Sequence, residues 1–158
     1  MNSIVSGFLK LLLSLSVLLL VSNSSYASDV SVMHPHIRAV PHGHPNSAAF
    51  MVLKNSSSEN RALVKASSKI SKAVELHTHV KEGGMMRMRQ VEKISIKANS
   101  KTILKPGGLH VMFIGLKQSL KVGDKIDLEL EFDDGSSIKL KAPVKMVAGM
   151  KMHKKNMH

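Results

Sequence analysis

The chain of 158 residues contains no cysteine. It therefore has no disulfide bonds and no thiolate that could bind a metal or act as a nucleophile. The same absence excludes a blue-copper electron-transfer site, which requires a cysteine ligand. The sequence also lacks the H-E-x-x-H pattern of helical metalloproteases. We therefore expect a protein that is stabilised by packing alone and is not an enzyme.

Aromatic and acidic residues are scarce as well. There is no tryptophan and one tyrosine, and 11 acidic residues face 23 basic ones, for a formal net charge of +12. This charge favours anionic membrane surfaces, nucleic acid or acidic partner proteins. Beyond residue 27 only Phe50, Phe113 and Phe132 could stack on bases, so nucleic acid is not an expected partner.

Residues 1–27 have the features of a signal peptide. Lys10 precedes an apolar run from Leu11 to Val21, and Ser25-Tyr26-Ala27 supplies small residues at the cleavage positions. The alternative is a retained membrane anchor, but the run is shorter than the roughly 20 residues that span a bilayer. We therefore expect cleavage after Ala27 and export to a bacterial periplasm.

The rest of the chain is expected to form one domain, residues 28–145, followed by a flexible tail, residues 146–158, that is rich in Met, His and Lys. In the domain, apolar residues alternate with polar ones from Lys125 to Phe132 and again from Ile138 to Ala142, around Asp133-Asp134-Gly135-Ser136. This pattern predicts a β-hairpin with one solvated face.

Similar short apolar runs recur along the domain between turn signals, with no long segment of helical period. They are residues 49–53, 62–66, 74–79, 86–91, 94–98, 102–104 and 109–116. Eight or nine strands at this spacing predict an all-β protein, and specifically a β-sandwich.

Two histidines and two methionines stand out: His77, Met88, His110 and Met112, in the pattern H-x10-M-x21-H-x-M. Imidazole and thioether ligands form an uncharged, soft donor set, which suits copper(I) better than zinc, magnesium or calcium. Taken singly, each methionine is more readily explained as core filling and each histidine as a surface or hydrogen-bonded residue. The joint pattern favours a copper(I) site.

Strand alternation and glycine turns explain how these four residues could meet. His110 and Met112 are two apart, so they project from one face of a strand while Val111 and Phe113 face inward. Gly83-Gly84 and Pro106-Gly107-Gly108 precede Met88 and His110, and such turns let strand ends approach each other. Lys81, Arg87, Arg89 and Lys117 could form a basic rim around the site that suits an acidic acceptor, although an ordinary solvated face explains each of them equally well.

The sequence around these residues resembles the PCuAC family of periplasmic copper chaperones. The resemblance lies in Glu75-Leu76-His77, in Glu82 to Arg89, and in Lys105 to Met112 followed by Gly115-Leu116-Lys117. It extends from about Val30 to Val144. The resemblance implies a cupredoxin-like Greek-key β-sandwich that binds copper(I) through His77, Met88, His110 and Met112. It further implies delivery of this copper to the copper centre of cytochrome c oxidase during assembly.

Further histidines and methionines lie outside this pattern. A possible secondary site for copper(II) or zinc comprises His34, His36, His42 and His44, although solvated loop histidines explain them equally well. A second possible copper site lies in the tail, at Met150, Met152, His153, Met157 and His158. His79 neighbours the main site, but the pattern does not require it.

An alternative function would use the same residues. A copper-sequestering resistance protein would accumulate several copper ions per chain, whereas a carrier would hold one tightly. For the carrier we expect a monomer whose partner is the copper-bearing subunit of the oxidase or another periplasmic copper carrier.

Overall fold

The computed structural model describes residues 29–146, which form ten β-strands. They are β1 Val30–Arg38, β2 Asn46–Asn55, β3 Arg61–Ser67, β4 Ser71–Glu82, β5 Met85–Gln90, β6 Ile94–Ile96, β7 Lys101–Leu104, β8 His110–Leu116, β9 Lys125–Phe132 and β10 Ser137–Lys145. Within this range no helix is long and apolar enough to cross a membrane. The predicted all-β class is confirmed.

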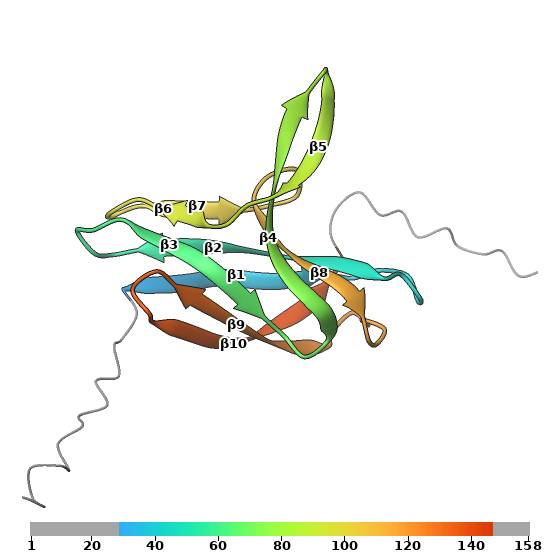
Figure 1. Ribbon diagram of the computed structural model, residues 1–158. Helices are drawn as coiled ribbons and strands as arrows, with labels where there is room; N and C mark the ends of the chain where they lie inside the picture. The colour runs from blue at the N-terminus through green and yellow to red at the C-terminus, as the bar shows by residue number, and fades with distance from the viewer. Residues whose placement is uncertain (1–28, 147–158) are drawn as a thin grey trace, which may run out of the picture.

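The strands form the two layers of a sandwich (Figure 1). Strands β5-β4-β8-β2-β1 follow one another in the first layer and β10-β9-β3-β6 in the second. The layers join where β1 pairs in parallel with β10, at Ile37 with Val144 and Arg38 with Lys145. Strand β2 pairs with β8 through residues 46–49 and with β7 through residues 51–54, so the loop between β7 and β8 lies beside Phe50.

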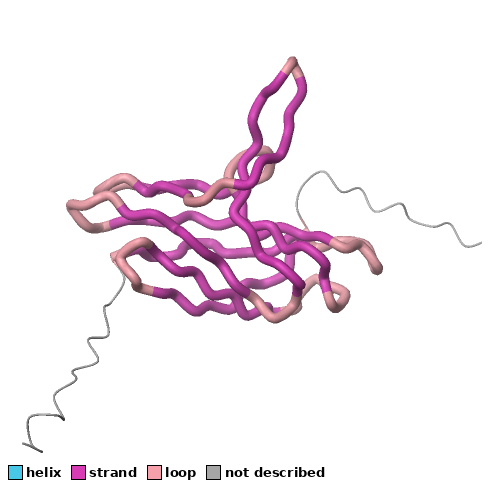
Figure 2. Tube along the Cα trace, in the orientation of Figure 1, coloured by secondary structure: helices cyan, strands magenta, loops and turns pink. Residues whose placement is uncertain are grey.

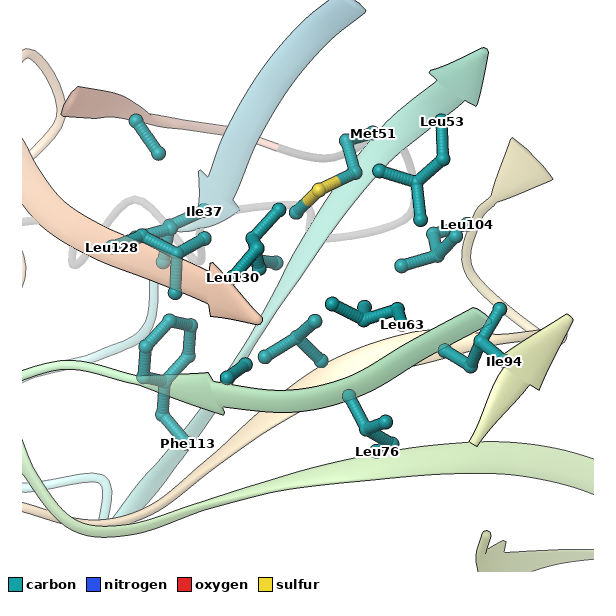
Figure 3. Packing of buried hydrophobic residues seen from close by; sticks show 14 of the residues in the cluster. Ile37, Met51, Leu53, Leu63, Leu76, Ile94, Leu104, Phe113, Leu128 and Leu130 are labelled. Atoms are coloured by element: carbon teal, nitrogen blue, oxygen red, sulfur yellow. The ribbon is translucent and has the colours of Figure 1, made fainter. Parts of the chain in front are cut away.

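The core lies between the layers and consists of alternate residues from both (Figure 3). Ile37, Met51 and Phe113 come from the first layer, and Leu63 and Leu130 from the second, all nearly inaccessible to solvent. Because side chains alternate across a strand, the neighbours of these residues face away from the core. The side chains on the outer face of the first layer are therefore available to form a binding site.

Strands β4 and β5 extend beyond the sandwich as a hairpin (Figures 1 and 2). Its two-residue turn is Gly83-Gly84, with φ angles of 57° and 84°. Positive φ at both central residues is the geometry of a type I′ turn, which glycine adopts without steric cost. The turn pairs Glu82 with Met85 and thereby fixes every later pair of the ribbon. All six residues of β5 are exposed.

Each expected apolar run lies within a strand or extends beyond its ends by at most two residues, and the predicted hairpin around residues 133–136 joins β9 to β10. The strands number ten because β1, which the apolar runs did not include, is also present. The predicted signal peptide lies outside the described residues, and so does the predicted flexible tail apart from Met146.

Replacing a core residue should cost far more stability than replacing its neighbour on the outer face. We expect Phe113→Ala to lower the free energy of unfolding by about 3–5 kcal/mol, because it removes a fully buried ring. The adjacent Met112→Leu should cost less than about 1.5 kcal/mol, because it conserves volume on the other face of β8. Urea denaturation of both variants measures the difference. Equal losses would contradict this assignment of the two faces.

Candidate metal centre

Three neighbouring strands bring the predicted ligands onto the outer face of the first layer. In the pairing of β4 with β8, His77 lies opposite His110, and Glu75 lies opposite Met112. In the pairing of β4 with β5, His79 lies opposite Met88. Since β4 residues two apart share a face, all of these side chains belong to one surface.

A cavity of about 190 Å³ opens on this surface. Its lining residues are Arg38, Ala48, Phe50, His79, Met88, Pro106, Gly107, His110 and Met112. The cavity thus gathers two imidazoles and two thioethers. A larger depression of about 620 Å³ lies elsewhere, along β9, and no histidine or methionine lines it.

The loop between β7 and β8 covers one side of the cavity. The Lys105 N–H donates a 2.9 Å hydrogen bond to the Leu109 carbonyl, which closes the loop, and Gly107 adopts a φ of 76° within it. Under this loop Phe50 is buried although it does not belong to the core between the layers. The loop also explains why His110, on the outer face of its strand, is only 2% exposed.

The carbonyl of Gly108 orients two histidine rings. It lies 2.9 Å from Nδ1 of His110 and 3.4 Å from Nδ1 of His79. A carbonyl can only accept, so Nδ1 is the donor in each contact, and in the neutral form of each ring Nε2 keeps its lone pair. A second hydrogen bond that fixes the tautomer is typical of metal-binding histidines. Both rings are therefore prepared to coordinate a metal through Nε2.

His77 is held in a different way. Its Nε2 lies 2.7 Å from Oε2 of Glu75, two residues earlier on the same face of β4. Its Nδ1 is buried and has no hydrogen-bond partner among the described residues. With Nε2 donating to the carboxylate, Nδ1 is the nitrogen that keeps a lone pair. The His77 ring centre is 5.8 Å from that of His110, beside the cavity.

Burial lowers the pKa of His110 below the ordinary histidine value of 6.5. The hydrogen bond to Gly108 opposes this shift, whereas the positive charges of His79, His77 and Arg38 add to it. At neutral pH the His110 ring is therefore uncharged, which is the form that binds metals. Protons compete with a metal for this ring only at lower pH than for an ordinary histidine.

The two methionines differ in their exposure. Met88 is 42% exposed on the projecting hairpin, and Met112 is partly buried between Glu75 of β4 and Ala48 of β2. A thioether has no proton to lose and carries no charge, so both remain soft ligands at any ordinary pH. Met112 can anchor a metal inside the cavity while Met88 faces solvent.

Three of the four predicted ligands, Met88, His110 and Met112, line the cavity, and His77 lies beside it. The imidazole that joins them is His79, which the sequence pattern did not require. A signal for it was present. A two-residue turn at Gly83-Gly84 places Met88 directly opposite His79, whereas His77 is opposite Gln90.

The expected basic rim is wrong for Arg87, Arg89 and Lys117, whereas Lys81 shares the face of His79. Arg87 and Arg89 lie opposite Val80 and Thr78, on the other face of the hairpin, and Arg89 forms a 2.7 Å ion pair with Glu82. Lys117 follows the end of β8 that is remote from His110. Alternation along the hairpin accounts for this outcome.

The cation that lines the cavity is Arg38, which sequence reasoning missed. Its Nε is buried without a hydrogen-bond partner among the described residues. Arg38 reaches the cavity because β1 pairs with β2. This strand pairing cannot be predicted from the local sequence pattern.

The four histidines near the N-terminus of the domain are not gathered into one site. His34 and His36 lie on β1 at an irregularity in its pairing, and His42 and His44 lie in the loop that follows. The His36 ring packs near Phe50, and the Nδ1 of His44 bonds the Asn46 carbonyl at 2.9 Å.

Across residues 29–146 no three side chains of His, Cys, Asp or Glu are arranged to hold one metal ion. The predicted tail site at Met150, Met152, His153, Met157 and His158 lies outside the described residues.

Comparison with known sequences identifies relatives over most of the domain. Residues 30–144 match the profile of the LpqE-like family, described as "Putative lipoprotein LpqE-like". "Putative lipoprotein Lxx21020" of Leifsonia xyli is 36% identical over 124 residues, which are 78% of this chain and 74% of the relative. The uncharacterized protein RP573 of Rickettsia prowazekii is 30% identical over 92 residues, 58% of this chain and 51% of the relative.

Solved structures share the fold. The solution structures of apo-DR1885 and CuI-DR1885 from Deinococcus radiodurans are 33% and 31% identical, with TM-scores of 0.62 and 0.61. Each match covers 80% of this chain, and 85% and 83% of the respective relative. The copper-bound PCuAC domain from PmoF2 has a TM-score of 0.65 at 22% identity, over 77% of this chain and 97% of that domain. The predicted β-sandwich of the PCuAC type is confirmed.

We expect the His110 ring to titrate below pH 6.5 in the metal-free protein, because its charged form is desolvated. In Arg38→Gln this pKa should rise, but stay below 6.5, since burial is the larger cause. Ring-proton NMR during a pH titration measures both values. A His110 pKa above 6.5 in the unsubstituted protein would show that the cavity is more hydrated than its burial implies.

Proposed function

Since this chain belongs to the LpqE-like family, we propose from its His/Met cavity that it is a periplasmic copper(I) chaperone. The observation that carries the proposal is the cavity itself, in which Met88, His110 and Met112 meet beside His77. These four residues are the proposed copper(I) ligands. The copper(I)-bound structure of DR1885 supports the same cargo.

The donor set explains a preference for copper(I) over zinc. Neutral imidazoles and thioethers leave the full charge of the ion uncompensated, and this costs less for a monovalent ion than for a divalent one. Thioethers also match the softness of copper(I), whereas zinc prefers thiolate, imidazole and carboxylate ligands. The nearby Arg38 adds to the penalty for a dication.

A carrier must also release its cargo. Met88 lies on the exposed hairpin at the mouth of the cavity, so an acceptor could replace this ligand first while His110 and Met112 still hold the ion. The proposed acceptor is the copper centre of cytochrome c oxidase, either directly or through another periplasmic carrier.

The proposed location is the periplasm, supported by the signal-like sequence of residues 1–27. We also propose that the mature protein acts as a monomer between copper source and acceptor.

Anaerobic titration with Cu(I) and with Zn(II), followed by native mass spectrometry, tests the proposal. We expect one tightly bound Cu(I) per chain, a lower affinity for Zn(II), and Cu(I) binding at least about tenfold weaker in Met88→Leu. The matched control is Met85→Leu, an exposed methionine on the other face of the same hairpin, which should bind like the unsubstituted protein.

Preference for zinc, or unchanged copper affinity in Met88→Leu, would overturn the proposed site. Several tight copper ions per chain would favour a sequestering protein over a carrier.

A further inference from the structure

We propose that His77 and His79 share one coordination position, so that the copper ion can exchange between two imidazoles on the same strand. The inference rests on the proposed function, because it concerns the ligands of the same copper(I) ion. It goes beyond the four-residue pattern by assigning His79 as a fifth donor.

The first argument is position. His79 lines the cavity together with Met88, His110 and Met112, and His77 does not. Its ring centre is 5.3 Å from that of His110, compared with 5.8 Å for His77. Its backbone is directly paired with that of Met88. Of the two imidazoles on β4, His79 is thus the one that already completes a His2Met2 set.

The second argument is the state of its ring. The Gly108 carbonyl, which fixes His110, also lies within reach of Nδ1 of His79 and leaves Nε2 with the free lone pair. An ordinary surface histidine would direct its ring to solvent. Here the His79 ring points toward the loop that precedes β8, and His79 lies opposite Met88 in the ladder.

The third argument concerns His77, which is prepared as well, but through the other nitrogen. The hydrogen bond to Glu75 leaves the buried, unpartnered Nδ1 as its donor atom. Coordination through Nδ1 would keep this bond, in the manner of carboxylate–histidine pairs at metal sites. The strand thus offers Nδ1 of His77 and Nε2 of His79 to one ion.

We expect the two imidazoles to bind the ion one at a time. Copper(I) is satisfied by two thioethers and two imidazoles, so one position remains for either ring. Movement of the ion from His77 to His79 brings it closer to Met88 and the exposed hairpin, which is the direction of release.

Copper affinities of His77→Ala, His79→Gln and the double variant test the exchange. We expect each single substitution to weaken Cu(I) binding by about tenfold or less and the double one to weaken it by far more than the product of the two, because either ring can replace the other. Competition with a chromophoric Cu(I) chelator under anaerobic conditions measures these affinities. Thr78→Ala, between the two histidines but on the opposite face, is the matched control.

The proposal is overturned if His79→Gln binds like the unsubstituted protein and the double variant like His77→Ala. In that outcome the proposed function stands, because Met88 and His110 still bind copper. If the unsubstituted protein itself fails to bind Cu(I), the proposed function fails instead.

NMR of the histidine nitrogens tests the same exchange without any substitution. Copper(I) is diamagnetic, so ring ¹⁵N signals can be followed as the protein is loaded. We expect shifts at Nδ1 of His77 and at Nε2 of both His79 and His110. Ring signals of His79 that stay unchanged on loading would overturn the proposal, even if a variant failed to fold.

Discussion

The site depends on strand alternation held in register by a glycine turn. Because Gly83-Gly84 forms a two-residue type I′ turn, β5 can pair with β4 in only one register. A shift by one residue would turn Met88 to the face that now carries Arg87 and Arg89. The pairing of β4 with β8 imposes the same condition on His110 and Met112. The sandwich core in turn holds β8 in place through Val111 and Phe113.

The cavity has one buried ligand residue, His110, and one exposed one, Met88. His110 lies under the loop between β7 and β8, where desolvation lowers its pKa and keeps the ring neutral. Met88 lies at the solvent boundary, where a thioether needs no such protection. Under the proposed function, the His110 side of the cavity would retain a soft cation and the Met88 side would release it. No carboxylate is among the described residues that line the cavity, and the neighbouring Glu75 is paired with His77.

Much of this arrangement could be predicted from the sequence. Alternation is a local signal, so most of the strands and the shared face of His110 and Met112 followed from it directly. The nonlocal contacts could not be predicted in the same way. Arg38 enters the cavity through the pairing of β1 with β2, and Gly108 orients two rings through the geometry of its loop. The expected basic rim did not take strand alternation into account, which places Arg87 and Arg89 on the face opposite Met88.

In a chain without disulfides, a bound copper ion could also stabilise the projecting hairpin. Strand β5 is exposed along its length, and beyond the sandwich the hairpin is supported by its own ladder and by the contact of His79 with the Gly108 carbonyl. An ion held by Met88, His110 and Met112 would link this ribbon to the body of the domain. It would close a loop through the intervening chain, as a disulfide does, but reversibly. The cargo would thus act as a reversible cross-link of its carrier, and its departure would free the hairpin that had presented it.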